Sequence, residues 1–154
     1  LELAVQSASK AQKIWARVPL KKKADSILKL CSLIETKAEE FAMMDTYNAG
    51  NAITFARKDV MQAVEHMKYF AGIIREVKGE TFSTEPSHLN FSRQQPYGIV
   101  LKINSFNRPF RWCAEKLAAP ILMGNAVIIK NSEQAPISSL KFCELLNGIF
   151  PDAR

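Results

Sequence analysis

The stretch from Pro96 to Pro136 limits what this chain can fold into more than any other part of the sequence. An apolar run, a polar turn, a helix-length segment, a Gly-Asn turn and a second apolar run follow one another there, in the order of a β-α-β unit. Two strands joined by a helix are most simply parallel, with a right-handed crossover. The pattern therefore predicts an α/β fold with a parallel sheet.

Both apolar runs are expected to be strands. The first, residues 98–103, is rich in β-branched and large apolar side chains and stops where short polar side chains begin. The second, residues 126–129, is closed by Lys130, whose charge a buried strand can carry only at its end. The carboxyl ends of parallel strands share one edge of a sheet, and open α/β sheets bind ligands there. We therefore expect Asn107 and Lys130 to lie at a common crevice.

The helix between the strands is predicted to begin near Arg108 and to end at the Gly-Asn turn, residues 124–125. Pro109 suits the first turn, because it has a fixed φ and no N–H to leave unpaired. One apolar stripe recurs at helical spacing: Phe110, Cys113, Ala114, Leu117 and Ile121. The charged residues lie mainly on other faces: Arg111, Glu115 and Lys116.

The motifs of this stretch occur in a specific order: Pro-x-Gly, strand, Phe-Asn-x-Pro, helix, Ala-Pro, Gly-Asn, strand, Lys-x-Ser-Glu-Gln-x-Pro. In that order the chain resembles the aldehyde dehydrogenase superfamily, in the first half of its cofactor domain. The resemblance implies a Rossmann-like NAD-binding unit whose first β-α-β-α part is residues 97–154. It also implies that the parent protein oxidises an aldehyde to a carboxylic acid with NAD(P).

The resemblance assigns one catalytic group to this chain. The side-chain amide of Asn107 matches the family's oxyanion donor, which hydrogen-bonds the aldehyde oxygen as a thiolate attacks and negative charge develops. The family's catalytic cysteine, general-base glutamate and glycine-rich cofactor turn lie beyond Arg154. The 154-residue chain alone is therefore expected to be inactive, as an excerpt of a longer enzyme.

Six positions match residues that bind the cofactor in the family: Ile103, Asn104, Phe106, Lys130, Ser132 and Glu133. Lys130 and Glu133 would bind the adenosine ribose hydroxyls. A carboxylate accepts hydrogen bonds from a ribose diol and repels a 2′-phosphate, so NAD is favoured over NADP. Two residues depart from the family pattern, since Ser105 and Asn131 stand where prolines are common. The loop that presents Ser132 and Glu133 is therefore expected to be less pre-organised.

Residues 1–78 are predicted to form an amino-terminal helical segment of the cofactor domain. Most of the net charge of +6 falls on residues 1–30, where seven Lys and Arg oppose two Asp and Glu, 7 − 2 = +5. We interpret this excess as a solvated helix face; a basic surface for an anionic partner is the alternative. The apolar side would be formed by Val5, Ala8, Ile14 and Trp15. Because we interpret the basic excess as solvated, nucleic acid is not expected as a partner. No apolar stretch approaches the ~20 residues that span a membrane, so a membrane is not expected either.

Two more helices are predicted in this segment. Residues 19–38 carry apolar side chains at helical spacing, and residues 41–44 extend that face to a break at residues 47–51. There the stretch Asp45-Thr46-Tyr47-Asn48-Ala49-Gly50 is an imperfect match to an Asp-x-Gly segment of the family. The longest helix is predicted over residues 53–77, because apolar residues step by three or four over about seven turns.

Residues 79–96 change character. Apolar and polar side chains alternate around a Glu-Pro-Ser turn, which is typical of exposed antiparallel strands. In the family the matching strands reach toward a neighbouring subunit, so we expect an exposed β hairpin and a homo-oligomer.

A last amphipathic helix is predicted after Pro136, which suits a helix N1 position. Its apolar face would contain Leu140, Cys143 and Leu146 and would cover the sheet.

The three cysteines, Cys31, Cys113 and Cys143, are odd in number and lack metal-ligand spacing. That pattern favours buried reduced thiols and a cytoplasmic location. Cys113 follows Asn107 closely, but it is not assigned the nucleophile's role, because the family's catalytic cysteine lies far downstream. His66 and His88 are interpreted as surface or boundary residues, so no metal site is predicted.

A composition of 47% hydrophobic and 23% charged residues is typical of globular domains. Two functional classes remain open. In the first, the chain is the amino-terminal part of an aldehyde dehydrogenase that acts on a small-molecule aldehyde. In the second, it is a non-catalytic remnant that binds a nucleotide or a protein partner.

Overall fold

The computed structural model describes residues 1–150 of the chain. Along these residues the elements are α1 (Glu2–Trp15), α2 (Leu20–Thr36), α3 (Ala38–Ala49), α4 (Ile53–Ile73), a 3-10 turn (Ile74–Glu76), β1 (Thr81–Glu85), β2 (His88–Phe91), β3 (Ile99–Ile103), α5 (Pro109–Glu115), α6 (Ala118–Leu122), β4 (Ala126–Lys130) and α7 (Ile137–Leu146). The predicted order of amino-terminal helices, hairpin and β-α-β unit is confirmed.

β3 and β4 form the parallel pair that the sequence predicts, with Ile99 opposite Ala126 and Ile103 opposite Lys130. At the start of the pair the Asn125 side-chain oxygen accepts the Gly98 N–H at 2.9 Å. The Gly-Asn turn thus aligns β4 with β3, and both strands end at the same edge.

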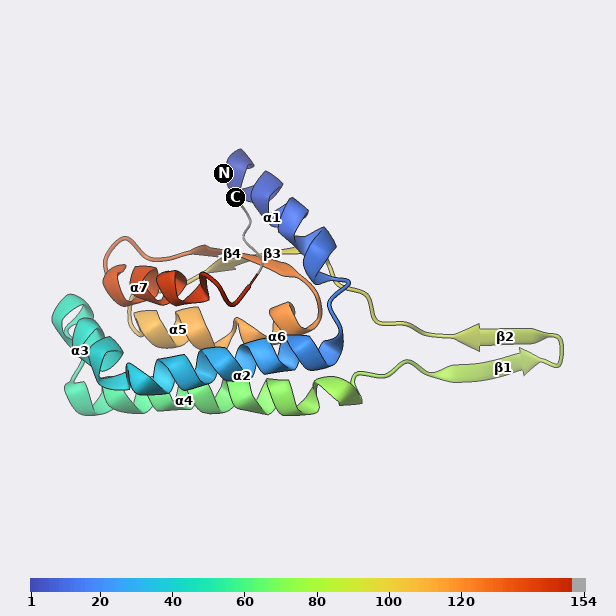
Figure 1. The fold of residues 1–154 in the computed structure, drawn as a ribbon, viewed down its shortest axis with the longest axis horizontal. Helices are drawn as coiled ribbons and strands as arrows, with labels where there is room; N and C mark the ends of the chain where they lie inside the picture. The colour runs from blue at the N-terminus through green and yellow to red at the C-terminus, as the bar shows by residue number, and fades with distance from the viewer. Residues whose placement is uncertain (151–154) are drawn as a thin grey trace.

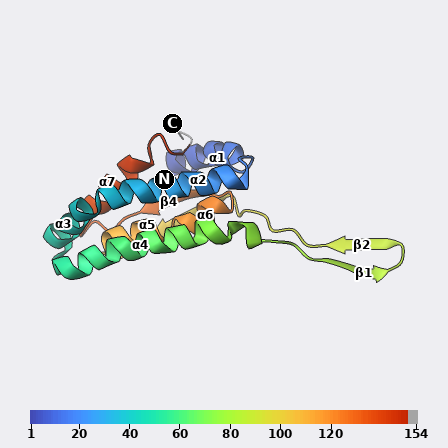
Figure 2. The same ribbon diagram turned by 60° about the horizontal axis from the view of Figure 1, so that its bottom comes forward.

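Helices cover this sheet in layers (Figure 1). α5 and α6 lie between the sheet and the layer formed by α2 and α4, whereas α1 crosses the other side and contacts β4. The turned view shows α4 running along the outer side of α5 and α6 (Figure 2). The amino-terminal helices and the β-α-β unit therefore share one core.

Three phenylalanine rings from different helices meet in that core. Phe110 of α5 is fully buried, with its ring centre 4.3 Å from that of Phe41 in α3 and 5.7 Å from that of Phe142 in α7. Burying a ring of this size is worth about 2–3 kcal/mol. Because Phe110 follows the turn after β3, this packing fixes where that turn lies.

The crossover differs from the single predicted helix, because it consists of α5 and α6 with a break at Lys116 and Leu117. Pro120 explains the break: it has no N–H to donate to the Lys116 carbonyl and is tolerated only in the first turn of a helix. Arg111 and Glu115 lie off the apolar stripe, where they face Asp59 and His66 of α4. Their side chains are only 15% and 9% exposed, in an ion-pair network described below.

α1 buries only part of its predicted apolar side. Ala8 and Trp15 are buried, and the Trp15 indole N–H donates to the Ile121 carbonyl at 2.7 Å. Val5 and Ile14 are 41% and 59% exposed. The side of α1 that faces β4 carries Ala4, Ala8 and Ala11, spaced three or four residues apart, and together with β4 it lines a cavity of about 370 Å³.

One lysine of the basic amino-terminal segment is not solvated as predicted. Lys23 is 4% exposed, and its ammonium donates to the Ala16 carbonyl at 3.3 Å. Burial lowers the pKa of Lys23. The remaining basic residues of the segment are exposed, as predicted: Lys10, Lys13, Arg17, Lys21, Lys22 and Lys29.

Two other helical predictions need correction. The face predicted over residues 19–44 lies on two helices, because the backbone at Lys37, with φ −115°, separates α2 from α3. α7 begins where predicted but buries Ser138, Ser139 and Phe142, and Leu140 is 58% exposed. The small serines let α7 approach α5, and the Ser139 hydroxyl donates to the Pro109 carbonyl at 3.1 Å.

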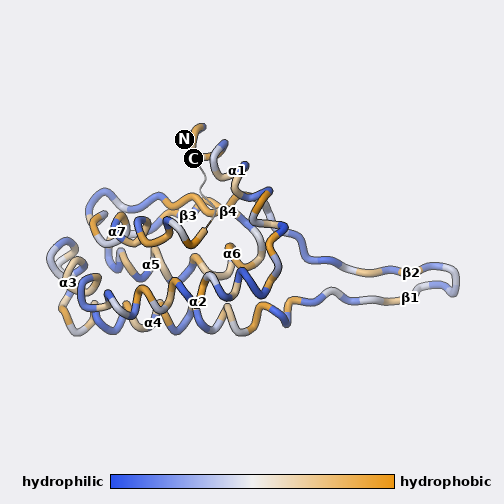
Figure 3. The backbone as a smooth tube through the Cα atoms, in the orientation of Figure 1, coloured by the Kyte–Doolittle hydropathy of each residue, from blue (hydrophilic) through white to orange (hydrophobic). Residues whose placement is uncertain are grey.

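The predicted hairpin is confirmed: β1 and β2 pair antiparallel and project from the helical body (Figures 1 and 2). Its strands carry hydrophobic stretches although they stand apart from the core (Figure 3). Phe82, Leu89 and Phe91 are 55%, 73% and 68% exposed. At its base a Cβ on Gly79 would lie 1.9 Å from the Ser92 carbonyl oxygen, so only glycine allows the two arms to meet.

The carboxyl group of Asp45, near the end of α3, is 2% exposed and lies beside α5 and α7. Burial raises the pKa of Asp45 to about 6, and the nearby Ser138 hydroxyl and the Phe110 N–H offset part of the rise. One oxygen of this carboxyl, Asp45 Oδ1, is among the buried side-chain atoms of the described residues that have no hydrogen-bond partner, as is Ser138 Oγ. Folding therefore favours the neutral form of Asp45.

This pKa makes stability depend on pH in a defined direction. Below the unfolded value of about 3.8 the neutral carboxyl stabilises the fold fully, and that contribution is lost as pH rises through about 6. Asp45→Asn stays neutral, so its unfolding free energy should exceed that of the wild type above pH 6 by up to about 3 kcal/mol, at about 1.4 kcal/mol per pKa unit. The exposed Asp25→Asn is the matched control. Urea unfolding of both variants between pH 4 and 8 tests this, and a constant Asp45→Asn difference would contradict it.

Candidate functional site

The loops that follow β3 and β4 are tied together at the carboxyl edge of the sheet. The Asn104 N–H donates to the Lys130 carbonyl at 3.0 Å, and the Asn104 side-chain amide donates to the Asn131 side-chain oxygen at 3.2 Å. Asn104 is 8% exposed. The side chain of Asn131 thus ties the two loops together, and the expectation of a less pre-organised loop at Ser132 and Glu133 stays a prediction.

Asn107 lies on the exposed turn between β3 and α5. Its side-chain oxygen accepts hydrogen bonds from the Ser105 hydroxyl at 2.7 Å and from the Trp112 indole N–H at 2.9 Å. Its main-chain carbonyl accepts the Asn51 amide at 3.1 Å. Among the described residues the Asn107 Nδ2 has no acceptor, so it is available to a ligand oxygen.

Lys130 and Glu133 lie across the same edge, at and just after the end of β4. Their side chains form an ion pair of 2.8 Å, and both are exposed, at 58% and 80%. The hydrogen bond from Lys130 lowers the pKa of Glu133. Next to this pair the Ser132 hydroxyl accepts the Gln134 N–H at 3.2 Å. The edge thus offers an ammonium and an ionised carboxylate to solvent.

Two of the other predicted cofactor residues also face solvent at this edge. Ile103 is 72% exposed and Phe106 is 53% exposed, on the turn that ends in Asn107. The arrangement brings hydrogen-bond donors, acceptors and exposed apolar surface together where β3 and β4 end. The positions of all seven predicted site residues agree with one shared edge, while their roles stay predictions.

The end of α3 supports this edge, which the sequence analysis missed. α5 and α7 have no side-chain cap of their own. The Asp45 carboxylate oxygen accepts the Phe110 N–H at 3.3 Å, and the Asn48 side-chain oxygen accepts the Ile137 N–H at 3.0 Å. Asn51, which holds Asn107, follows three residues later. The available signal was the spacing of three between Asp45 and Asn48, which places both on one face of α3; Asn51 follows Gly50, where the helix ends.

An ion-pair network between α4 and α5 was also missed. Arg111 is hydrogen-bonded to Asp59 at 3.0 Å, to Gln62 at 2.6 Å and to Glu115 at 2.6 Å. His66 Nδ1 lies 2.9 Å from the second Glu115 oxygen. His66 is thus a boundary residue, as predicted, with a carboxylate partner. Because each charged group has a partner of opposite charge, the carboxylates of Asp59 and Glu115 and the guanidinium of Arg111 can be mostly buried.

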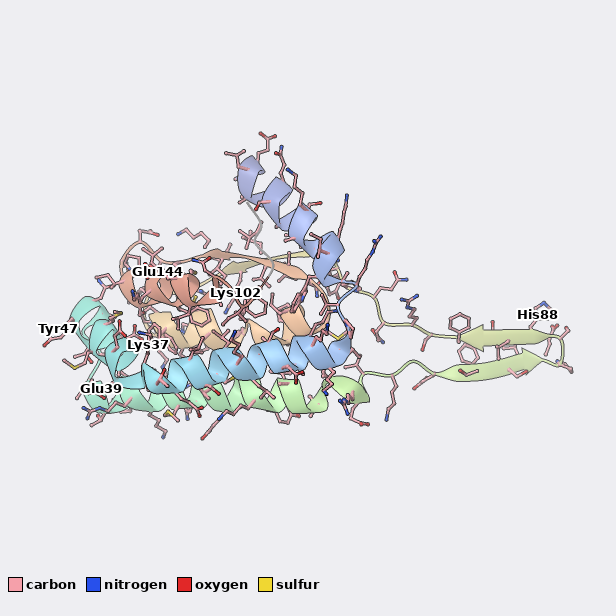
Figure 4. All side chains as sticks on the ribbon, viewed as in Figure 1. Lys37, Glu39, Tyr47, His88, Lys102 and Glu144 are labelled. Atoms are coloured by element: carbon pink, nitrogen blue, oxygen red, sulfur yellow. The ribbon has the colours of Figure 1, made fainter. Side chains whose placement is uncertain are left out.

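Lys102 is a half-buried amine to which the sequence analysis gave no role. It lies within the body of the molecule, whereas His88 stands at the tip of the hairpin (Figure 4). The Lys102 ammonium donates to the Cys113 carbonyl at 2.8 Å, and burial lowers the pKa of Lys102 to about 8.

The thiols are free, as predicted, and two of them are buried: Cys31 and Cys113, with Cys143 half-buried. The neighbouring Cys143 and burial raise the pKa of Cys113, so Cys113 is unsuited to act as a thiolate nucleophile. In the part of the chain described by the structure, no group of three metal-ligating side chains comes together. Nor does any helix of residues 1–150 combine the length and apolar character needed to cross a membrane.

Comparisons with known proteins agree on one family. The sequence pattern of the aldehyde dehydrogenase family matches residues 1–152. Aldehyde dehydrogenase tropH of Talaromyces stipitatus is 33% identical over 98% of this chain and 30% of its own length.

Solved structures show the same fold. PnpE from Pseudomonas sp. WBC-3, in complex with nicotinamide adenine dinucleotide, has a TM-score of 0.93 at 30% identity over 99% of this chain and 32% of its own. Glyceraldehyde-3-phosphate dehydrogenase GapN from Methanocaldococcus jannaschii, complexed with NADP, has a TM-score of 0.90 at 27% identity over 96% and 32%.

The chain spans about a third of the length of these relatives. Within that span the fold is the same, with TM-scores of 0.90 and 0.93. The chain therefore belongs to the aldehyde dehydrogenase family.

Proposed function

We propose that the chain is the amino-terminal part of an NAD(P)-dependent enzyme that oxidises a small-molecule aldehyde to a carboxylic acid. The observation that carries the proposal is the exposed amide of Asn107 at the carboxyl edge of β3, with Nδ2 free to donate. A fixed N–H donor beside a ligand-binding edge suits an oxygen that gains negative charge during a reaction.

In the proposed reaction a cysteine thiolate from outside residues 1–154 attacks the carbonyl carbon of the aldehyde. The carbonyl oxygen takes the negative charge, and Asn107 Nδ2 donates a hydrogen bond to it. That bond is stronger to the charged oxygen than to the neutral aldehyde, so it lowers the barrier. The nicotinamide cofactor supplies the hydride acceptor when bound.

The cofactor proposal is supported by the donor set at the edge. Lys130 and Glu133 present a cation and a carboxylate to solvent, which suits the hydroxyls of an adenosine ribose. The backbone near Ile103, Asn104 and Phe106 would line the groove, with Ser132 beside it. PnpE binds NAD and GapN binds NADP, so relatives use both. We propose NAD for this protein, because Glu133 would repel a 2′-phosphate.

We further propose that the protein is a cytoplasmic homo-oligomer. The exposed apolar side chains of the hairpin support association, since such strands otherwise invite uncontrolled pairing. The proposed division is a helical segment over residues 1–78, association strands over 79–96 and the first part of the cofactor-binding unit over 97–154. No observation favours a non-catalytic remnant.

Asn107→Ala in the full-length enzyme tests the central proposal. It should lower kcat by about 10²-fold or more, because the developing charge loses its donor. The rate is followed through the absorbance of the reduced cofactor. Asn147 lies at the carboxyl end of α7. The variant Asn147→Ala is the matched control and should leave kcat unchanged. An unaltered rate in Asn107→Ala would refute the oxyanion role.

Glu133→Gln tests the cofactor preference. The full-length variant should bind NAD more weakly while losing less affinity for NADP, because an amide no longer repels the 2′-phosphate. Calorimetric titration with each cofactor measures the two dissociation constants. Glu144→Gln is the control, since Glu144 forms the same kind of ion pair with Lys141, at 2.7 Å, away from the edge. Equal losses for both cofactors in Glu133→Gln would reject the preference.

Residues 1–154 alone should not oxidise aldehydes. A purified fragment incubated with NAD and a set of aldehydes should produce no reduced cofactor, because Cys113 is buried and the proposed nucleophile lies elsewhere. The full-length enzyme, assayed in parallel, is the positive control. Turnover by the fragment at high purity would show that the nucleophile is within this segment.

A further inference from the structure

We infer that Trp112 and Ser105 are positioning residues for Asn107, because their hydrogen bonds determine which end of the Asn107 amide faces the reacting oxygen. The inference rests on the proposed oxyanion role of Asn107. It concerns two side chains of this sequence that flank Asn107, Ser105 and Trp112.

The chemistry of the two partners fixes the orientation of the amide. An indole N–H can only donate, so the Asn107 atom 2.9 Å from it must be the oxygen. The Ser105 hydroxyl, 2.7 Å from the same oxygen, donates as well, because that oxygen has no proton to offer. A flipped amide would place its NH₂ group against the indole N–H, with two donors facing each other. Both lone pairs of Oδ1 are therefore occupied and Nδ2 is left outward.

The indole is itself held in place. The Lys116 ammonium lies 4.9 Å from the centre of the Trp112 ring and the Arg111 guanidinium 5.6 Å from it, both within cation–π range. Arg111 is in turn fixed by Asp59 of α4 and Glu115 of α5. A chain of contacts thus runs from the packed helices to the amide on the exposed turn.

The backbone of Asn107 is fixed separately, by the Asn51 amide at 3.1 Å from its carbonyl oxygen. The side-chain torsions of Asn107 are left to be set by Trp112 and Ser105. Without Trp112 and Ser105, rotation would turn Oδ1 toward the substrate oxygen, where it would repel the developing charge. Loss of either donor should therefore lower the rate of the chemical step and leave substrate binding nearly unchanged.

The test is a double-mutant cycle in the full-length enzyme. Trp112→Phe keeps the ring and removes the donor, and it should lower kcat about fivefold with KM values for aldehyde and cofactor within about twofold, as for one neutral hydrogen bond. Ser105→Ala should act similarly, and Ser105→Thr, which keeps the hydroxyl, should restore kcat. In the Asn107→Ala background Trp112→Phe should cause no further loss.

Three results would overturn the inference: an unchanged kcat in Trp112→Phe, an equal loss in the Asn107→Ala background, or a change confined to KM. If these occur while Asn107→Ala lowers kcat about 10²-fold, the inference fails and the proposed function stands. An Asn107→Ala variant with normal kcat would refute both the positioning inference and the proposed oxyanion role of Asn107.

A matched substitution separates positioning from general loss of stability. The Trp15 indole N–H donates to the Ile121 carbonyl at 2.7 Å, remote from the edge that carries Asn107. Trp15→Phe should lower the melting temperature and leave kcat unchanged. If Trp15→Phe reduced kcat as much as Trp112→Phe, the effect of Trp112 would be structural and the inference would be wrong.

Discussion

The carboxyl edge of the sheet depends on hydrogen bonds from the end of α3 and the residue that follows it, which lie far from that edge in the sequence. Asp45 caps α5, Asn48 caps α7 and Asn51 holds the carbonyl of Asn107. Helices that begin directly after a sheet edge leave free N–H groups, and these two have no caps of their own. One helix end therefore fixes both segments that follow the parallel strands.

This support has a free-energy cost that the core offsets. Asp45 is buried with one oxygen unpartnered, which is unfavourable at neutral pH, where the carboxyl is ionised. The rings of Phe41, Phe110 and Phe142 pack around the same helix ends and contribute about 2–3 kcal/mol each. Aromatic packing thus stabilises the position of the capping group as well as the helices that it caps.

Two polar side chains at the edge, Ser105 and Asn131, form hydrogen bonds within and between its turns. Ser105 donates to the side chain of Asn107, and Asn131 accepts from Asn104. The resulting edge combines ordered loops with exposed functional groups. Asn107 Nδ2 is left free because both hydrogen bonds to the amide go to its oxygen, and the Lys130–Glu133 pair is exposed.

The sequence by itself determined the order of elements, the parallel pair and the edge shared by Asn107 and Lys130, because alternating turns and apolar runs are local signals. The break before Pro120 also has a local cause, proline's missing N–H, whereas the tertiary structure alone decided the burial of Arg111 and the role of the end of α3. Those features depend on partners more than 40 residues away along the chain, such as Asp45 and Phe110. A periodicity shows that a face is apolar, whereas the partner of a polar group is set only when distant helices pack together.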